Sequence, residues 1–180
     1  PYNTAASLYI WEVTTQHLDQ IFKSAEELTT DNKVSYYDSP IGLIELQADR
    51  GKLLSLNFQE VKRYPEEENN FLLAAKDQLD EYFMGERKEF KLPLKLEGTD
   101  FQKSVWEQLL EIPYGDTFSY KEVAEAIDNN KAAVGNANNK NSIPVIVPCH
   151  RVTASSGEVG GYGAGIWRKK WLLEHEKNNS

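Results

Sequence analysis

The segment Ile143-Pro144-Val145-Ile146-Val147-Pro148-Cys149-His150-Arg151-Val152 carries the only cysteine of the 180-residue chain, directly beside a histidine. The β-branched apolar run 143–147 predicts a buried strand that ends at Pro148. A thiolate is the reactive form of cysteine, and a neighbouring imidazole commonly generates it near neutral pH. Free cysteine is also commonly a small buried hydrophobe. Cys149 is therefore either a nucleophile at the end of a strand or the last core residue of that strand.

The composition narrows the class of protein. Apolar residues make up 40% of the chain, which is enough for a core. A single cysteine excludes an intramolecular disulfide framework and suits a reducing compartment. No segment approaches the roughly 20 apolar residues of a membrane span, and the first residues lack a signal-peptide pattern. We therefore expect a cytoplasmic protein without a membrane partner.

Charge is spread unevenly along the chain. The net charge is −8, yet residues 131–173 contain six basic residues and one acidic residue, Glu158. Salt screens distant acidic residues beyond about 10 Å, so this local surplus would favour a polyanion at short range. The alternative interpretation is an ordinary solvated face.

The first half of the chain predicts a small antiparallel sheet with one helix. Asp38-Ser39-Pro40-Ile41-Gly42 is a turn between two alternating segments, which indicates a β-hairpin. The strands are expected at 33–37, 43–48 and 52–58, the amphipathic helix at 71–83, and a proline-bearing edge segment at 91–94. An additional helical pattern covers 15–28.

The second half predicts short helices. A helix is expected at 101–110. Ser119 and Glu122 form a capping box that begins the next helix at Tyr120. Asn130 can cap a further helix from Lys131, and the pair predicts a helix-turn-helix. Its second helix is rich in alanine and includes Gly135, which suits close approach to another helix or to a minor groove.

These motifs, in this order, resemble the O6-alkylguanine-DNA alkyltransferase family. The resemblance runs from about Ser35 to Glu176, and residues 1–32 lie outside it. The matching segments are 38–42, 98–102, 112–120, 133–138, 143–152, 160–162 and 171–176. The resemblance implies an α+β fold in which residues 33–96 form a ribonuclease H-like domain of antiparallel sheet and helix. Residues 97–180 would form a helical domain with the helix-turn-helix, and residues 1–32 an N-terminal extension of unknown role.

The resemblance implies direct-reversal DNA repair by an irreversible, single-turnover methyltransferase. Cys149 would accept the alkyl group from O6-alkylguanine, with O4-alkylthymine as a further candidate substrate. His150 would act as base through a water, oriented by Glu176. Tyr120 would protonate the leaving guanine, and Asn141 would tie the recognition helix to the strand before Cys149.

The partner implied is double-stranded DNA, entered from the minor groove with the damaged base flipped out. A monomer without cofactor or metal is expected. The residues expected to contact DNA or the base are Gln102, Tyr120, Lys121, Lys131, Ala132, Ala133, Gly135, Ala137, Arg151, Val152, Ser155, Tyr162 and Gly163.

One departure leaves alternatives open. Where the family carries an arginine that holds the target base out of the stack, this chain has Ala132. A weakly active protein, or a non-catalytic binder that recruits other repair factors, is therefore the second hypothesis, although the presence of Cys149 argues against the binder. A cysteine hydrolase lacks local support. A zinc site from Cys149, His150, His175 and Glu176 has suitable residue types, but adjacent helical residues point about 100° apart.

Overall fold

The computed structural model describes residues 32–180, apart from the side chain of Lys131. The helix expected at 15–28 and nearly all of the N-terminal extension lie outside the described residues. Within 32–180, no helix is long and apolar enough to cross a membrane.

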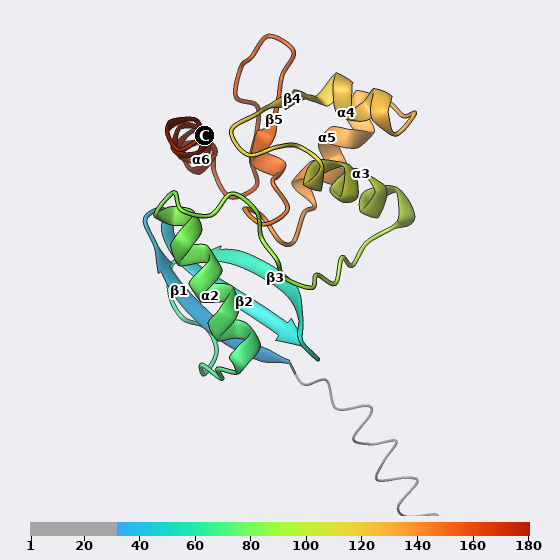
Figure 1. The fold of residues 1–180 in the computed structure, drawn as a ribbon. Coiled ribbons are helices and arrows are strands. Elements are labelled where there is room, and N and C mark those ends of the chain that lie inside the picture. Colours follow the sequence, from blue (N-terminus) through green and yellow to red (C-terminus); the bar gives the residue numbers. More distant parts are fainter. Residues whose placement is uncertain (1–31) are drawn as a thin grey trace, which may run out of the picture. The chain divides into compact units, whose positions relative to one another are not determined.

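Three antiparallel strands form the first sheet, in the order β1-β2-β3 (Figure 1). Their bounds are β1 Lys33–Ser39, β2 Gly42–Asp49 and β3 Lys52–Gln59, which confirms the hairpin and the third strand. Gly42 closes the first turn at φ +117°, a conformation that side chains with a Cβ rarely adopt. The central strand is buried on both faces, because Ile44 and Leu46 are buried and so is the intervening Glu45.

Helix α2, Asn70–Phe83, lies across one face of this sheet (Figure 1) and confirms the predicted helix. The Asn69 side chain begins it by accepting a hydrogen bond from the Leu72 amide at 2.8 Å. Leu72, Leu79 and Tyr82 lie on its buried face. The proline-bearing segment that follows α2 joins the edge of β3 only at Leu94, which forms an isolated bridge with Leu53.

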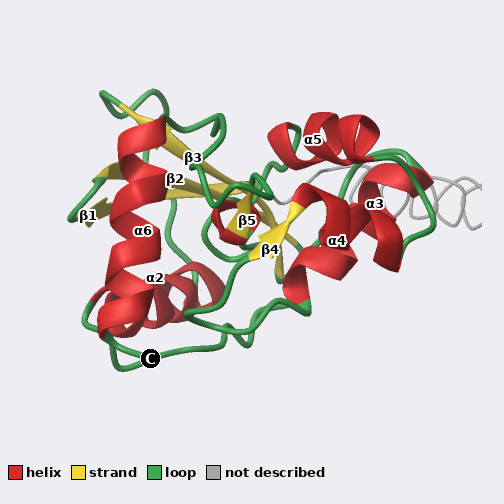
Figure 2. Cartoon of the chain, turned by 90° about the horizontal axis from the view of Figure 1, so that it is seen from above, coloured by secondary structure: helices red, strands yellow, loops and turns green. Residues whose placement is uncertain are grey.

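The helices of the second half confirm the helix-turn-helix. Helix α3 is Asp100–Leu110, α4 is Tyr120–Ala126 and α5 is Lys131–Asn139, and both the Ser119–Glu122 capping box and the Asn130 cap are present. Figure 2 shows α3, α4 and α5 packed together. The Trp106 indole lies in this core and donates to the Ala137 carbonyl at 2.9 Å.

Two short strands and a last helix complete the second half. Strand β4, Phe118–Ser119, pairs in parallel with β5, Val152–Thr153. Helix α6 is Ile166–Asn178. Since β5 directly follows Cys149–Arg151, this pairing fixes the cysteine segment beside the start of α4.

The predicted strand at 143–147 is wrong. These residues are buried but form a tight turn, closed by a hydrogen bond from the Val147 amide to the Ile143 carbonyl at 2.9 Å. Pro144 and Pro148 have no N–H to donate to a ladder, so a regular strand is disfavoured here. Val145 has φ +74°, a strained conformation for a β-branched residue, and it lies four residues before the cysteine.

Candidate active site

Cys149 begins a short 3-10 helix, Cys149–Arg151, directly after the turn. Its side chain is buried, and it lines a cavity of about 580 Å³ together with residues of α5, β3 and the 163–164 segment. The Asn138 amide donates to the Cys149 carbonyl at 3.3 Å and fixes the backbone of this residue. A buried sulfur in a cavity wall can meet a bound molecule, which favours the nucleophile over the purely structural interpretation.

Asn141 shapes the turn that presents the cysteine. Its amide nitrogen donates to the Val147 carbonyl at 2.9 Å, and its amide oxygen accepts from the Ile143 backbone at 3.0 Å. The side chain therefore clamps both ends of the turn just after α5 ends. Asn141 thus bonds within the turn before Cys149, and its role in tying the recognition helix to this segment stays a prediction.

Glu176, on α6, is the centre of a buried hydrogen-bond network. Its Oε1 lies 2.7 Å from His150 Nε2 and accepts from the Tyr82 hydroxyl at 2.7 Å. Its Oε2 accepts from Arg151 Nε at 2.9 Å and from the Gly115 amide at 3.2 Å. Burial alone would raise the pKa of Glu176, but His150 and Arg151 outweigh it and hold that pKa well below its usual range. Glu176 is thus a carboxylate that accepts on both oxygens.

The carboxylate determines which nitrogen of His150 can act as a base. An ionised carboxylate only accepts hydrogen bonds, so His150 Nε2 carries the proton toward Glu176 and Nδ1 keeps its lone pair. Nδ1 is buried and bonds to no described residue. Burial lowers the pKa of His150, although Glu176 opposes this. The neutral imidazole, which can accept a proton at Nδ1, is therefore the form present near neutral pH.

Arg151 does not fit the predicted contact with DNA. Its guanidinium is buried, bonded to Glu176 through Nε and Nη2 and to the Ile112 carbonyl through Nη1 at 2.6 Å. A planar fork suits such bidentate pairing with a carboxylate. Arg151 therefore locks Glu176 in place from inside the protein.

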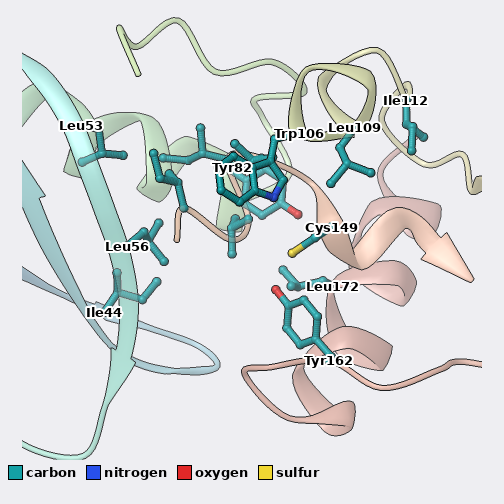
Figure 3. Close-up of a cluster of buried hydrophobic side chains, with 14 of the residues drawn as sticks. Ile44, Leu53, Leu56, Tyr82, Trp106, Leu109, Ile112, Cys149, Tyr162 and Leu172 are labelled. Carbon is teal, nitrogen blue, oxygen red and sulfur yellow. The ribbon is translucent and has the colours of Figure 1, made fainter. Parts of the chain in front are cut away.

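The Cys149 thiol is surrounded by groups that act on its ionisation in opposite directions. Burial raises its pKa, while the Asn141 amide and the Lys169 ammonium act to lower it. Figure 3 shows the Tyr162 hydroxyl pointing toward the sulfur. Because the net pKa is raised, the resting residue is a thiol, and it must lose its proton during the reaction.

Lys169 is a buried cation of the site. It lies on α6, donates to the Val152 carbonyl at 2.6 Å, and sits 5.9 Å from the centre of the Tyr120 ring. Burial lowers the pKa of Lys169, whereas the nearby Cys149 sulfur raises it. A positive charge here stabilises the thiolate as it forms.

Tyr120 lies at the first turn of α4, as the capping box predicts. A Cβ added at Gly135 would lie 3.9 Å from its ring and one at Gly160 3.6 Å, which is ordinary van der Waals contact, so both glycines border the ring. Burial raises the pKa of its hydroxyl, and the charge of Cys149 adds to this. A phenol that keeps its proton is suited to donating one.

The other residues expected to contact DNA fall into three groups. Lys121 and Ser155 line one surface cleft at the start of α4, Ala132 and Gly163 are exposed, and Ala133 is partly exposed. Gln102 is partly buried and engaged in the capping box with Thr99, and the side chain of Lys131 is not described. Ala137 and Val152 are buried, so contact through their side chains does not fit the structure.

Fewer of the basic residues within 131–173 lie on the surface than the sequence suggests. Lys169 and Arg151 are buried, and Arg168 is partly buried. Within 131–173, the described basic side chains that are exposed are those of Lys140 and Lys170. The positive charges nearest the cysteine, those of Lys169 and Arg151, are therefore buried within the protein and do not form a basic surface.

Sequence reasoning missed three residues of this site. Tyr82 lies within the amphipathic pattern predicted at 71–83, which indicates no role in a site. Asn138 was placed only in the alanine-rich helix, and Lys169 was counted only as surface charge. Nothing in the spacing indicates that these groups converge on Cys149 and Glu176, because they come from three different helices.

His175 points away from the cysteine. Its Nε2 lies 2.8 Å from the Tyr82 carbonyl, and its ring stacks on Trp171 with centroids 4.8 Å apart. Among residues 32–180, we find no group of three histidine, cysteine or acidic side chains placed to hold a metal ion.

These features define a two-part α+β protein in which a buried cysteine, next to a buried histidine–glutamate pair, lies beside a helix-turn-helix. Residues 32–96 match the family model "6-O-methylguanine DNA methyltransferase, ribonuclease-like domain", and residues 100–178 match the DNA binding domain of the same family. The chain belongs to the 6-O-methylguanine DNA methyltransferase family.

Relatives and solved structures agree with this assignment. The methylated-DNA–protein-cysteine methyltransferase of Methanosarcina barkeri is 47% identical over 80% of this chain and 98% of its own length. That of Mycobacterium bovis is 47% identical over 79% of this chain and 91% of its own. The crystal structure of the Mycobacterium tuberculosis O6-methylguanine methyltransferase has a TM-score of 0.73 at 46% identity and covers 82% of this chain and 94% of its own. A structure of the M. tuberculosis protein in complex with DNA has a TM-score of 0.72 at 47% identity and covers 81% of this chain and 94% of its own.

Proposed function

We propose that this protein repairs double-stranded DNA by transferring the alkyl group of O6-alkylguanine to Cys149, once per molecule. The observation that carries the proposal is the buried thiol in a cavity wall beside the His150–Glu176 pair. Family membership and the DNA complex of the M. tuberculosis relative support DNA as the partner. The minor groove and a monomeric state are parts of the same proposal.

The proposed reaction is an in-line displacement. The Cys149 sulfur forms a bond to the alkyl carbon as the carbon–O6 bond breaks. The thiol proton passes toward Nδ1 of His150 through a water, and Glu176 stabilises the resulting imidazolium. Tyr120 donates a proton to the departing guanine, so that a neutral base leaves.

Nothing among the described residues of the site would return Cys149 to the free thiol. A thioether carbon is not activated for attack by water, and the relay only removes a proton from sulfur. Consumption of the protein after one transfer follows. Because the thiol must stay reduced until then, we also propose a reducing compartment such as the cytoplasm.

The proposal is tested by stoichiometry. Mixed with an excess of duplex carrying radiolabelled O6-methylguanine, the protein should acquire one methyl group per molecule and then stop. A plateau well above one label per molecule would contradict a single-use acceptor. No label on protein, with the duplex bound, would favour the alternative of a non-catalytic binder.

Ala132 gives a prediction about base flipping. It is exposed in the first turn of α5, where a side chain could reach the minor groove. Ala132→Arg should speed methyl transfer from duplex DNA, because an inserted side chain offsets unstacking that costs a few kcal/mol. Transfer from free O6-benzylguanine, which needs no flipping, should change little. Single-turnover rates on the two substrates measure the difference.

The matched control is Ala126→Arg, which adds the same charge at an exposed position on α4. Equal acceleration by both variants would indicate simple charge attraction. Equal acceleration of duplex and free base by Ala132→Arg would mean that this protein extrudes the base by another route.

A further inference from the structure

Arg168, on α6, joins three separate segments around the cysteine cavity. Its Nη1 donates to the Ala164 carbonyl at 2.7 Å, and its Nε donates to the Ile41 carbonyl at 2.8 Å. Ala164 belongs to the glycine-rich segment 159–165, and Ile41 belongs to the turn between β1 and β2. One guanidinium thus connects the cavity wall to the first sheet.

The same guanidinium lies close to two aromatic rings. Its central carbon lies 4.6 Å from the centre of the Phe58 ring and 4.5 Å from that of Trp167. An arginine guanidinium makes such cation–π contacts more readily than a lysine ammonium does. Gly42 accommodates the arrangement, because an added Cβ there would lie 3.1 Å from Arg168 Nη2.

Two of these contacts bear directly on the reaction cavity. Phe58 and Ala164 both line the cavity that contains Cys149. Arg168 itself is not among its lining residues, and it has no contact with Glu176 or His150 among the described interactions. Arg168 therefore contacts two parts of the wall, Phe58 and Ala164, without belonging to the proton relay.

The geometry of the displacement shows why this wall matters. Sulfur, alkyl carbon and O6 must lie in line, so any substituent on that carbon must extend sideways into the cavity. A methyl group carries only hydrogens there and needs little space. A benzyl group carries a ring that must pack against the wall.

We propose that Arg168 is a positioning residue that fixes the width of the cavity and so sets which alkyl groups Cys149 accepts. This inference rests on the proposed alkyl transfer. Without the guanidinium, the 159–165 segment loses its link to the Ile41 turn, and Phe58 loses the group that packs on its ring. The wall that holds a bulky alkyl group in line would then be loose, whereas methyl transfer would depend mainly on contacts with the guanine.

The test compares single-turnover transfer of methyl and benzyl groups, both from O6-modified guanine in the same duplex. Arg168→Ala should slow benzyl transfer by about tenfold or more and methyl transfer by less than about threefold, since small misplacements of reacting groups have large kinetic effects. Arg168→Lys should reproduce the loss, because lysine keeps the charge but lacks the fork and the flat face. Lys170→Ala, an exposed position on the same helix, is the matched control and should change neither rate.

A second readout does not depend on activity. Hydrogen exchange of the 159–165 amides should accelerate in Arg168→Ala and Arg168→Lys but not in Lys170→Ala. If Arg168→Ala does not fold, Arg168→Lys carries both measurements. Full recovery of the wild-type rate ratio and exchange by lysine would overturn the inference, because charge alone would then suffice.

The outcomes for the unmodified protein separate the two proposals. Transfer of neither group means that the proposed function fails, and this inference falls with it. Transfer of methyl but not benzyl overturns only the inference, because the cavity would then not accept the larger group. Transfer of both, with an unchanged ratio in the arginine variants, also overturns only the inference.

Discussion

Replacing Cys149 with alanine should abolish alkyl transfer completely while leaving DNA binding nearly unchanged. The sulfur is the atom that forms the new bond, and it is the only thiol in the chain. The surface at α4 and α5 does not include it, because the side chain is buried in the cavity wall. Binding of a fluorescent duplex and transfer of a labelled methyl group, measured on the same preparation, separate the two properties.

Cys149→Ser is the matched control for this expectation. It places a hydroxyl where the thiol was and so provides a far poorer nucleophile, and transfer should again be lost. Methyl transfer that persists in either variant would show that another residue is the acceptor.

Disabling the His150–Glu176 pair should give the second largest effect. His150→Ala removes the base, and loss of a general base slows a reaction by roughly 10²–10⁴-fold. Glu176→Gln should also slow transfer, because the amide does not stabilise an imidazolium as a carboxylate does. Rates should be measured against pH, because the reaction then depends on spontaneous ionisation of the thiol in His150→Ala, and depends on it more than in the wild type in Glu176→Gln, where the base is weakened. Burial raises the pKa of that thiol, so the variant rates should climb as pH rises.

The transfer rate of the wild-type protein should depend on pH in the acidic range, whereas the variant rates change in the alkaline range. Burial lowers the pKa of His150, so its imidazole stays neutral at and above its ordinary range. Transfer should therefore fall only when acid protonates His150. A wild-type profile that rises steeply through alkaline pH, like those of the variants, would contradict a functioning relay.

Glu176→Gln also removes the carboxylate that pairs with the buried Arg151, which should lower the stability of the protein. This loss of stability must be separated from the effect on the transfer rate. Leaving Arg151 buried without its carboxylate should cost about 3–5 kcal/mol of unfolding free energy. Tyr82→Phe is the matched control, because it removes one hydrogen bond to Oε1 but keeps the carboxylate and its bond to His150. It should reduce stability modestly and leave the shape of the pH profile unchanged.

Local patterns were sufficient to predict much of the fold. Alternating residues and the Asp38–Gly42 turn predicted the first sheet, and capping residues predicted where α4 and α5 begin. The failure at 143–147 has a physical reason. Apolar, β-branched character reports burial correctly, but the flanking prolines and the Asn141 clamp decide that the backbone turns.

The site could be predicted in part. Adjacent residues such as Cys149 and His150 are visible as a motif, and the family resemblance supplied Glu176 and Asn141. Whether a charged residue faces solvent or the interior depends on which helix faces meet, and a single sequence does not show this. Arg151 and Lys169 were therefore interpreted as surface charge, although one locks Glu176 and the other supports the thiol.

The most direct test of the central claim is to locate the transferred group. After reaction with an O6-methylguanine duplex, intact-mass and peptide analysis should find one added methyl group, on the peptide that contains Cys149 and on its sulfur. The mass should not return to its starting value on prolonged incubation, because the thioether is not hydrolysed. A methyl group on any other residue, or an unchanged protein after the lesion has been repaired, would contradict the account.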